Sequence, residues 1–134
     1  MHRRLISLGA VVAGFLVTAL ASTVTDAVLH AVHVFPPAPQ RMSNELFVLA
    51  SAYRAVFTVA GGYVTARLAP DWPLRHAWVL AGIGLVAGLA GIGAYFAMGG
   101  EAVGPIWYAV SLPIQAIPCV WLGGWLAARR RAGR

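Results

Sequence analysis

Ionisable side chains lie well inside two long apolar stretches of this sequence, where an ionised group is costly and commonly has a function. Asp26, His30 and His33 occur in the first apolar stretch, and Arg54 occurs in the second. A carboxylate beside imidazoles could relay protons, because histidine exchanges protons near neutral pH. A carboxylate facing an arginine could instead form an intramembrane ion pair. Which chemistry applies depends on the elements that position these residues.

The composition is that of a membrane protein. Of the 134 residues, 60% are hydrophobic and only 10% are charged, whereas about a quarter of the residues of a soluble domain are charged. A helix of about 20 residues crosses the hydrocarbon core, and four apolar stretches are long enough: 5–34, 46–68, 76–98 and 106–128. We therefore expect an all-α fold with one domain, residues 1–134. Because the connections are short, the four transmembrane helices should form an antiparallel bundle.

The placement of the arginines predicts the orientation in the membrane. All ten basic residues are arginines, and most lie at the two termini or near the loop 69–75. The positive-inside rule places these segments in the cytoplasm, and we expect the inner, or plasma, membrane of a bacterial cell. The net charge of +6 could indicate a nucleic-acid partner, but most of the arginines lie at the ends of apolar stretches. A negatively charged leaflet attracts juxtamembrane arginines, so we expect anionic lipid headgroups, and no nucleic acid, as the acidic partner.

The N-terminal segment has a second interpretation, as a secretory signal peptide. It begins with the basic run MHRR, continues with an apolar run, and contains the small-x-small sequence Ala19-Leu20-Ala21, which is the pattern of a cleavage site. The apolar stretch continues to Val34, which favours an uncleaved transmembrane helix. Cleavage after Ala21 would place Asp26 and both histidines on a free arm outside the membrane.

Depth in the membrane predicts that Asp26 pairs with Arg54. Asp26 precedes the end of its stretch at Val34 by as many residues as Arg54 follows the start of its own at Leu46, so both should lie about 12 Å below the same interface. Opposite charges at equal depth on adjacent helices form the simplest arrangement that tolerates both. Gln115, about 15 Å from the start of the fourth helix, would complete the polar cluster.

The two histidines leave several interpretations open. They lie on the same helical side as Asp26, where they either bond to backbone or headgroups near the interface or relay protons with the carboxylate. A zinc site needs about four ligands, and Glu45 or Cys119 would have to come from other layers, so metal or haem is a minor alternative and no cofactor is expected. The chain lacks a G-x-S-x-G motif, and we expect no enzymatic activity.

Paired small residues predict close helix packing. The sequences GGYVTAR at 61–67 and GGWLAAR at 123–129 share one pattern, which suggests two repeated helical hairpins. The third helix has the spacing Gly84-x-x-x-Gly88, which serves either packing within the chain or a homo-oligomer interface. The glycines expected at contacts are Gly61, Gly62, Gly84, Gly88, Gly123 and Gly124.

Two functions compete on these grounds. The first is a non-catalytic packing or interaction module, in contact with a second copy or a larger membrane partner, with Asp26 and Arg54 fixing the helix register. The second is a small oligomeric, proton-linked transporter that uses the same cluster. Pro113 and Pro118 favour the second function, because they should kink or open the fourth helix beside Gln115.

Overall fold

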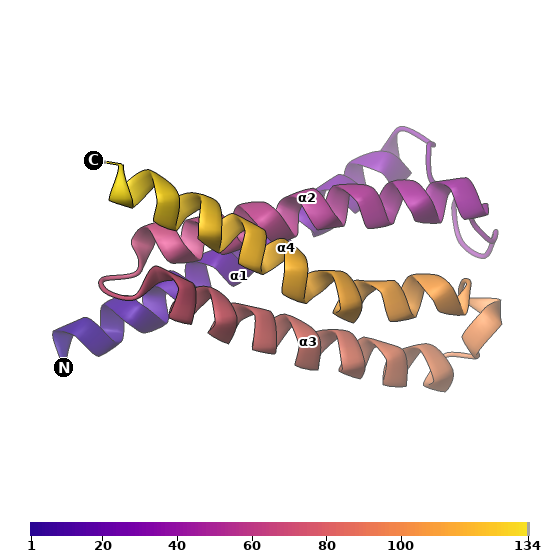
Figure 1. Cartoon of the computed structure of the whole chain (residues 1–134). Helices are drawn as coiled ribbons and strands as arrows, with labels where there is room; N and C mark the ends of the chain where they lie inside the picture. The colour runs from indigo at the N-terminus through magenta and orange to yellow at the C-terminus, as the bar shows by residue number, and fades with distance from the viewer. Residues whose placement is uncertain (134) are drawn as a thin grey trace.

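Four long helices make up most of the computed structural model, which describes residues 1–133 (Figure 1). They are α1 (His2–Ala31), α2 (Asn44–Leu68), α3 (Pro73–Ala97) and α4 (Ile106–Ala132), and a short 3₁₀ helix, η1 (Gly100–Ala102), precedes α4. Each long helix is long and apolar enough to cross a membrane. The all-helical class and the four candidate membrane spans are therefore confirmed.

The chain reverses direction at each connection, so that both termini and the α2–α3 loop lie at one end of the molecule (Figure 1). The other two loops lie at the opposite end. An ion pair joins segments at each end: Arg3 with Asp71 at 3.0 Å, and Arg41 with Glu101 at 3.2 Å. Both pairs are exposed, and such pairs contribute little to stability, so the arrangement of the helices must depend on their packing.

Glycines allow α2 to approach both α1 and α4 backbone to backbone. A Cβ atom on Gly61 would overlap Thr18 of α1, and one on Gly62 would overlap the carbonyl group of Val120. Gly14 of α1 faces Gly61 in turn, and this contact was not anticipated from the sequence. Because apolar side chains gain nothing by leaving lipid, such close contacts are a main source of helix association in membranes.

The glycines of the Gly84-x-x-x-Gly88 motif on α3 pack against α4 of the same chain. A Cβ atom on Gly88 would lie 2.6 Å from Cβ of Pro113, and one on Gly84 would lie 3.2 Å from Cβ of Ala116. Of the two interpretations of this motif, the structure adopts packing against α4. Around Gly82 and Gly93, on the same helix, there is open space.

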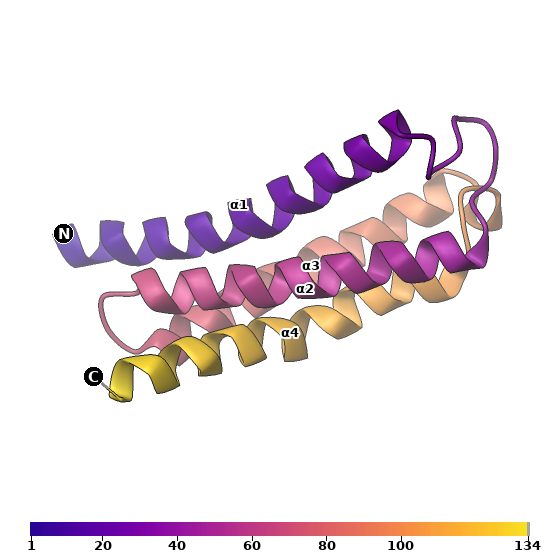
Figure 2. The same cartoon turned by 90° about the horizontal axis from the view of Figure 1, so that it is seen from above.

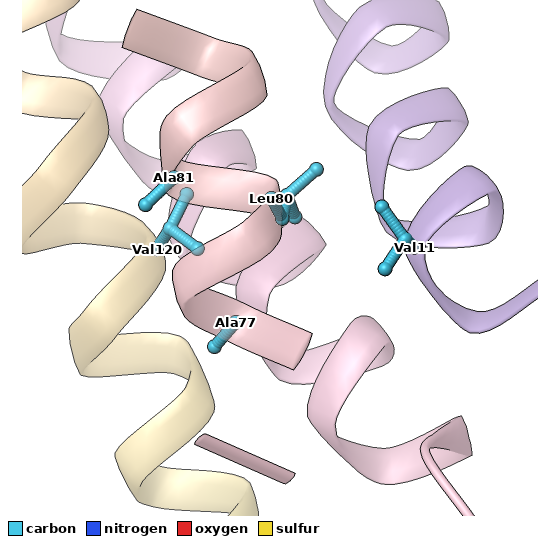
Figure 3. Close-up of a cluster of buried hydrophobic side chains, with 5 residues drawn as sticks. All are labelled: Val11, Ala77, Leu80, Ala81 and Val120. Atoms are coloured by element: carbon cyan, nitrogen blue, oxygen red, sulfur yellow. The ribbon is translucent and has the colours of Figure 1, made fainter. Parts of the chain in front are cut away.

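The buried apolar cluster is small and lies toward the end of the bundle that carries the termini (Figure 3). It joins α1, α3 and α4 through Val11, Ala77, Leu80, Ala81 and Val120. Large apolar side chains remain exposed on the outer faces, among them Val86 at 67% and Phe96 at 65%. An exposed apolar surface of this kind matches a chain whose outer faces contact lipid rather than water.

We predict that Gly123→Ala lowers the thermal midpoint in mild detergent, whereas Gly82→Ala leaves it unchanged or slightly raises it. The added methyl group at position 123 would overlap the Val59 carbonyl oxygen, and overpacking of this kind costs about 1–3 kcal/mol. At position 82 it would meet open space. Equal midpoints for the two variants would contradict the close contact between α2 and α4.

Candidate functional site

The Asp26 carboxylate lies between two consecutive side chains of α2. Arg54 Nη2 donates to Asp26 Oδ2, and Tyr53 Oη donates to Asp26 Oδ1. The side chains of Arg54 and Asp26 are each 30% exposed. The structure thus brings together the two charged residues that the sequence paired, and it adds Tyr53, which sequence reasoning missed. The only available signal was a hydroxyl-bearing aromatic residue next to a membrane arginine.

The two charges meet although they stand at different distances from their helix ends. Asp26 lies about 7.5 Å along the helix axis from Ala31, whereas Arg54 lies about 15 Å from Asn44, at the α-helical rise. α1 ends short of the first turn of α2 along the bundle (Figure 2), so the two distances are counted from different levels. Equal depth in the membrane stays a prediction.

Gln115 joins the same region of α2 without contacting the ion pair. Ser51 Oγ donates to Gln115 Oε1 at 3.2 Å, and Ser51 is one helical turn before Arg54. One turn after Arg54 on the same helix, the Thr58 hydroxyl donates to the backbone carbonyl of Arg54 at 2.7 Å. The guanidinium Nε of Arg54 is buried and has no partner among residues 1–133. The cluster therefore retains donor capacity beyond the ion pair.

His30 does not contact the Asp26 carboxylate. Its Nδ1 lies 2.8 Å from the backbone carbonyl oxygen of Asp26, so this nitrogen must carry the proton and donate. The ring is exposed and packs edge-on against Phe35, with the ring centroids 5.3 Å apart. A relay from Asp26 through His30 has no direct hydrogen bond in this geometry.

His33 lies outside the helix, so its placement on the polar side of a helix extending to residue 34 was wrong. α1 ends at Ala31, and His33 has φ of 59°. Its amide donates to the His30 carbonyl at 3.1 Å, while Val34 donates to the Leu29 carbonyl at 2.9 Å. These two bonds form a Schellman motif, which ends a helix through a left-handed residue. His33 is exposed there and lies beyond the cluster.

A cavity of about 570 Å³ adjoins the cluster. Arg54, Gln115 and Ser22 contribute polar groups to its wall, and α3 contributes mainly small apolar residues. Several α3 residues that line it, including Ala87 and Gly91, remain exposed. The cavity therefore opens to the surface beside α3. Figure 2 shows α1 set apart from the other helices toward its C-terminal end.

Over the part of the chain that the structure describes, no three side chains of His, Cys, Asp or Glu gather at one place where they could hold a metal ion. Cys119 is half-buried on α4 and Glu45 is exposed in the first turn of α2. The two additional ligands considered from the sequence therefore do not join Asp26 and His30.

Comparisons with protein-family models, with curated proteins and with solved structures found no match to this chain. Its own side chains and cavity are therefore the basis for inferring its function.

We predict energetic coupling between Asp26 and Arg54 in a double-mutant cycle on thermal stability in detergent. Asp26→Asn and Arg54→Gln should each destabilise by about 1–3 kcal/mol, since each leaves a partly buried charge without its partner. The double variant should recover much of the loss. As a control, Arg3→Gln with Asp71→Asn should give coupling of at most about 0.5 kcal/mol, because that pair is exposed. Strict additivity at the first pair would contradict the structural role.

A second prediction concerns His33. His33→Gly should keep or raise the thermal midpoint, because glycine adopts positive φ without steric cost. His33→Val should lower stability by about 1–2 kcal/mol, the cost of the left-handed conformation for a residue with a branched Cβ. A loss of stability in His33→Gly as large as in His33→Val would show that the imidazole itself is required.

Proposed function

We propose that this chain is a multi-pass inner-membrane protein that acts as a non-catalytic packing and interaction module. The observation that carries the proposal is the placement of Asp26: each of its carboxylate oxygens accepts a hydrogen bond from one of two consecutive residues of α2. A carboxylate held in this way fixes the register of α1 against α2. The positions of His30 and His33 also support a structural role.

The proposed orientation places both termini in the cytoplasm. The arginines of the two termini and of the α2–α3 loop lie at one end of the molecule (Figure 1), and the positive-inside rule then orients all four helices as an antiparallel bundle. The last turn of α4 alone contributes Arg129, Arg130 and Arg131. At the membrane surface these groups favour anionic headgroups.

The proposal of two repeated helical hairpins rests on the shared motif of α2 and α4, in which Gly61 and Gly62 correspond to Gly123 and Gly124. Both motifs contribute to the α2–α4 contact: Gly62 packs against the backbone of Val120, and Gly123 packs against the backbone of Val59. Because Gly62 corresponds to Gly124, this contact is one residue out of register with the repeat.

Association with a second copy or a larger membrane partner would use a different face of α3 from the one considered first. Gly84 and Gly88 are occupied by α4, whereas Gly82 and Gly93 have open space around them. Small residues on an open apolar face allow another helix to approach closely. No partner is implied in the aqueous phase.

We predict that the purified protein, reconstituted in liposomes, conducts no protons above the level of protein-free liposomes when a pH-sensitive dye reports the flux. The Asp26→Asn variant should behave in the same way. A proton flux that Asp26→Asn abolishes, with the thermal midpoint showing that the variant is folded, would overturn the module proposal.

A small oligomeric proton-linked transporter is the second candidate, and the cavity beside Arg54 and Gln115 is the observation that favours it. Pro113 of α4 packs against Gly88 at this level, and α4 changes direction in its middle section (Figure 1). A transporter requires water in this cavity. Ser22→Cys in a Cys119→Ala background tests this requirement, because Ser22 lines the cavity. Rapid modification by a membrane-impermeant thiol reagent would favour transport, and protection would favour the module.

A further inference from the structure

The cavity has the shape of a narrow slot along α3. Its wall includes Leu80 and Ala94, which are about 21 Å apart along the helix axis. A volume of about 570 Å³ open to the centres of water-sized atoms, spread over that length, corresponds to a mean width of about 9 Å between the surrounding atomic surfaces. A slot of this length and width accommodates a single extended chain.

The two sides of the slot differ in chemistry. On the α3 side the wall is almost entirely apolar, and its small residues create the space: Gly84, Ala87, Gly88, Gly91 and Ala94. Toward the end with the termini, the slot ends at Leu80 and Val120, two members of the buried cluster in Figure 3. At the opposite end, Tyr95 donates to the Gly104 carbonyl at 3.2 Å, and both residues line the slot.

The opposite wall carries hydrogen-bond donors without partners. Ser22 is only 6% exposed and lines the slot, yet its hydroxyl makes no hydrogen bond to any other residue in 1–133. Arg54 Nε is also unpaired within this range, but it has almost no accessible surface, so a ligand in the slot cannot reach it. Gln115 uses one end of its amide for Ser51, which leaves the other end for the slot. A buried donor left unsatisfied costs about 1–3 kcal/mol, so a ligand that supplies acceptors would be favoured.

The charge state of the Asp26–Arg54 pair distinguishes a neutral head group from an anionic one. Arg54 is already neutralised by Asp26, so an anionic head group would leave a net charge inside the membrane, which is costly. A neutral head group with carbonyl oxygens satisfies the donors without this cost. We propose that the slot binds an amphiphile with one apolar chain along α3 and a neutral, carbonyl-bearing head group at Ser22 and Gln115. This inference goes beyond the module function and does not depend on it.

The test uses the full chain in detergent, with a photoreactive diazirine analogue of methyl palmitate as the probe and mass spectrometry to locate the labelled residues. Labelling is expected on the α3 wall of the slot, and excess methyl palmitate should compete with it. Hexadecane, which lacks acceptors, and palmitate, which is anionic, should compete much less well. Equal competition by hexadecane, or stronger competition by palmitate, would overturn the proposed head group.

Two glycine variants form a matched pair for the site. Gly91→Phe places a large side chain in the slot, whereas Gly9→Phe in α1 places it outside the residues that line the slot, and neither Cβ meets an atom within 4 Å. The first variant should lose labelling and the second should keep it, with both thermal midpoints close to that of the unmodified chain. Full labelling of Gly91→Phe, or cross-links between two copies in place of ligand labelling, would overturn the site.

Ser22→Ala tests the head group without affecting the fold, because the hydroxyl has no partner within residues 1–133. We expect methyl palmitate to compete about fivefold less well in this variant, the loss of one hydrogen bond. Competition by hexadecane should be unchanged. No change for methyl palmitate would show that the head group does not lie at Ser22.

Discussion

The close approach of α2 to its neighbours is the constraint on which the other features depend. In lipid, apolar side chains gain nothing by leaving their surroundings, so helices associate where their backbones can come close. The two adjacent glycines of α2 serve different partners: Gly61 faces Gly14 of α1, and Gly62 faces Val120 of α4. Because consecutive residues point about 100° apart on a helix, one short motif fixes α2 against two helices at a single level.

The ion pair follows from this packing. Once α1 and α2 are held at Gly14 and Gly61, the positions of Asp26 and Arg54 along their helices are set, and their side chains meet. The ion pair can fix the register of α1 against α2 without being the interaction that drives their association. An unpaired charge at this level would be costly, so any slip along the α1–α2 contact is penalised twice, by lost backbone contact and by a broken pair.

Sequence reasoning predicted the features that depend on composition and spacing. Four apolar stretches gave four helices, and the predicted packing glycines lie at helix contacts. Sequence reasoning did not predict the features that depend on backbone conformation, such as the residue at which the first helix ends. Extending the first helix to residue 34 ignored the run Pro36-Pro37-Ala38-Pro39, which cannot continue a helix and disfavours it in the preceding residue. His33 therefore forms the end of a Schellman motif rather than part of a polar stripe.

Other features could not be predicted because they depend on side-chain reach. Tyr53 and Arg54 are consecutive and point in different directions from the helix axis, yet both reach Asp26, since long side chains can converge on one group. Gly14 has no paired glycine in the sequence, and only the position of α2 shows why a side chain there would clash. Spacing predicts which face of a helix is available but not which atom of another helix meets it.

The small residues of α3 connect packing with the slot. Gly84 and Gly88 allow close packing of α4 and also line the slot. The slot therefore adjoins the contact between Gly88 and Pro113. It lies in the part of the bundle where α1 is set apart from the other helices (Figure 2). Filling this space with larger side chains would give a tighter bundle, but donors on the opposite wall would remain unsatisfied. The Asp26–Arg54 pair then has a second consequence: by neutralising the only arginine on that wall, it makes the slot selective for acceptors rather than for anions.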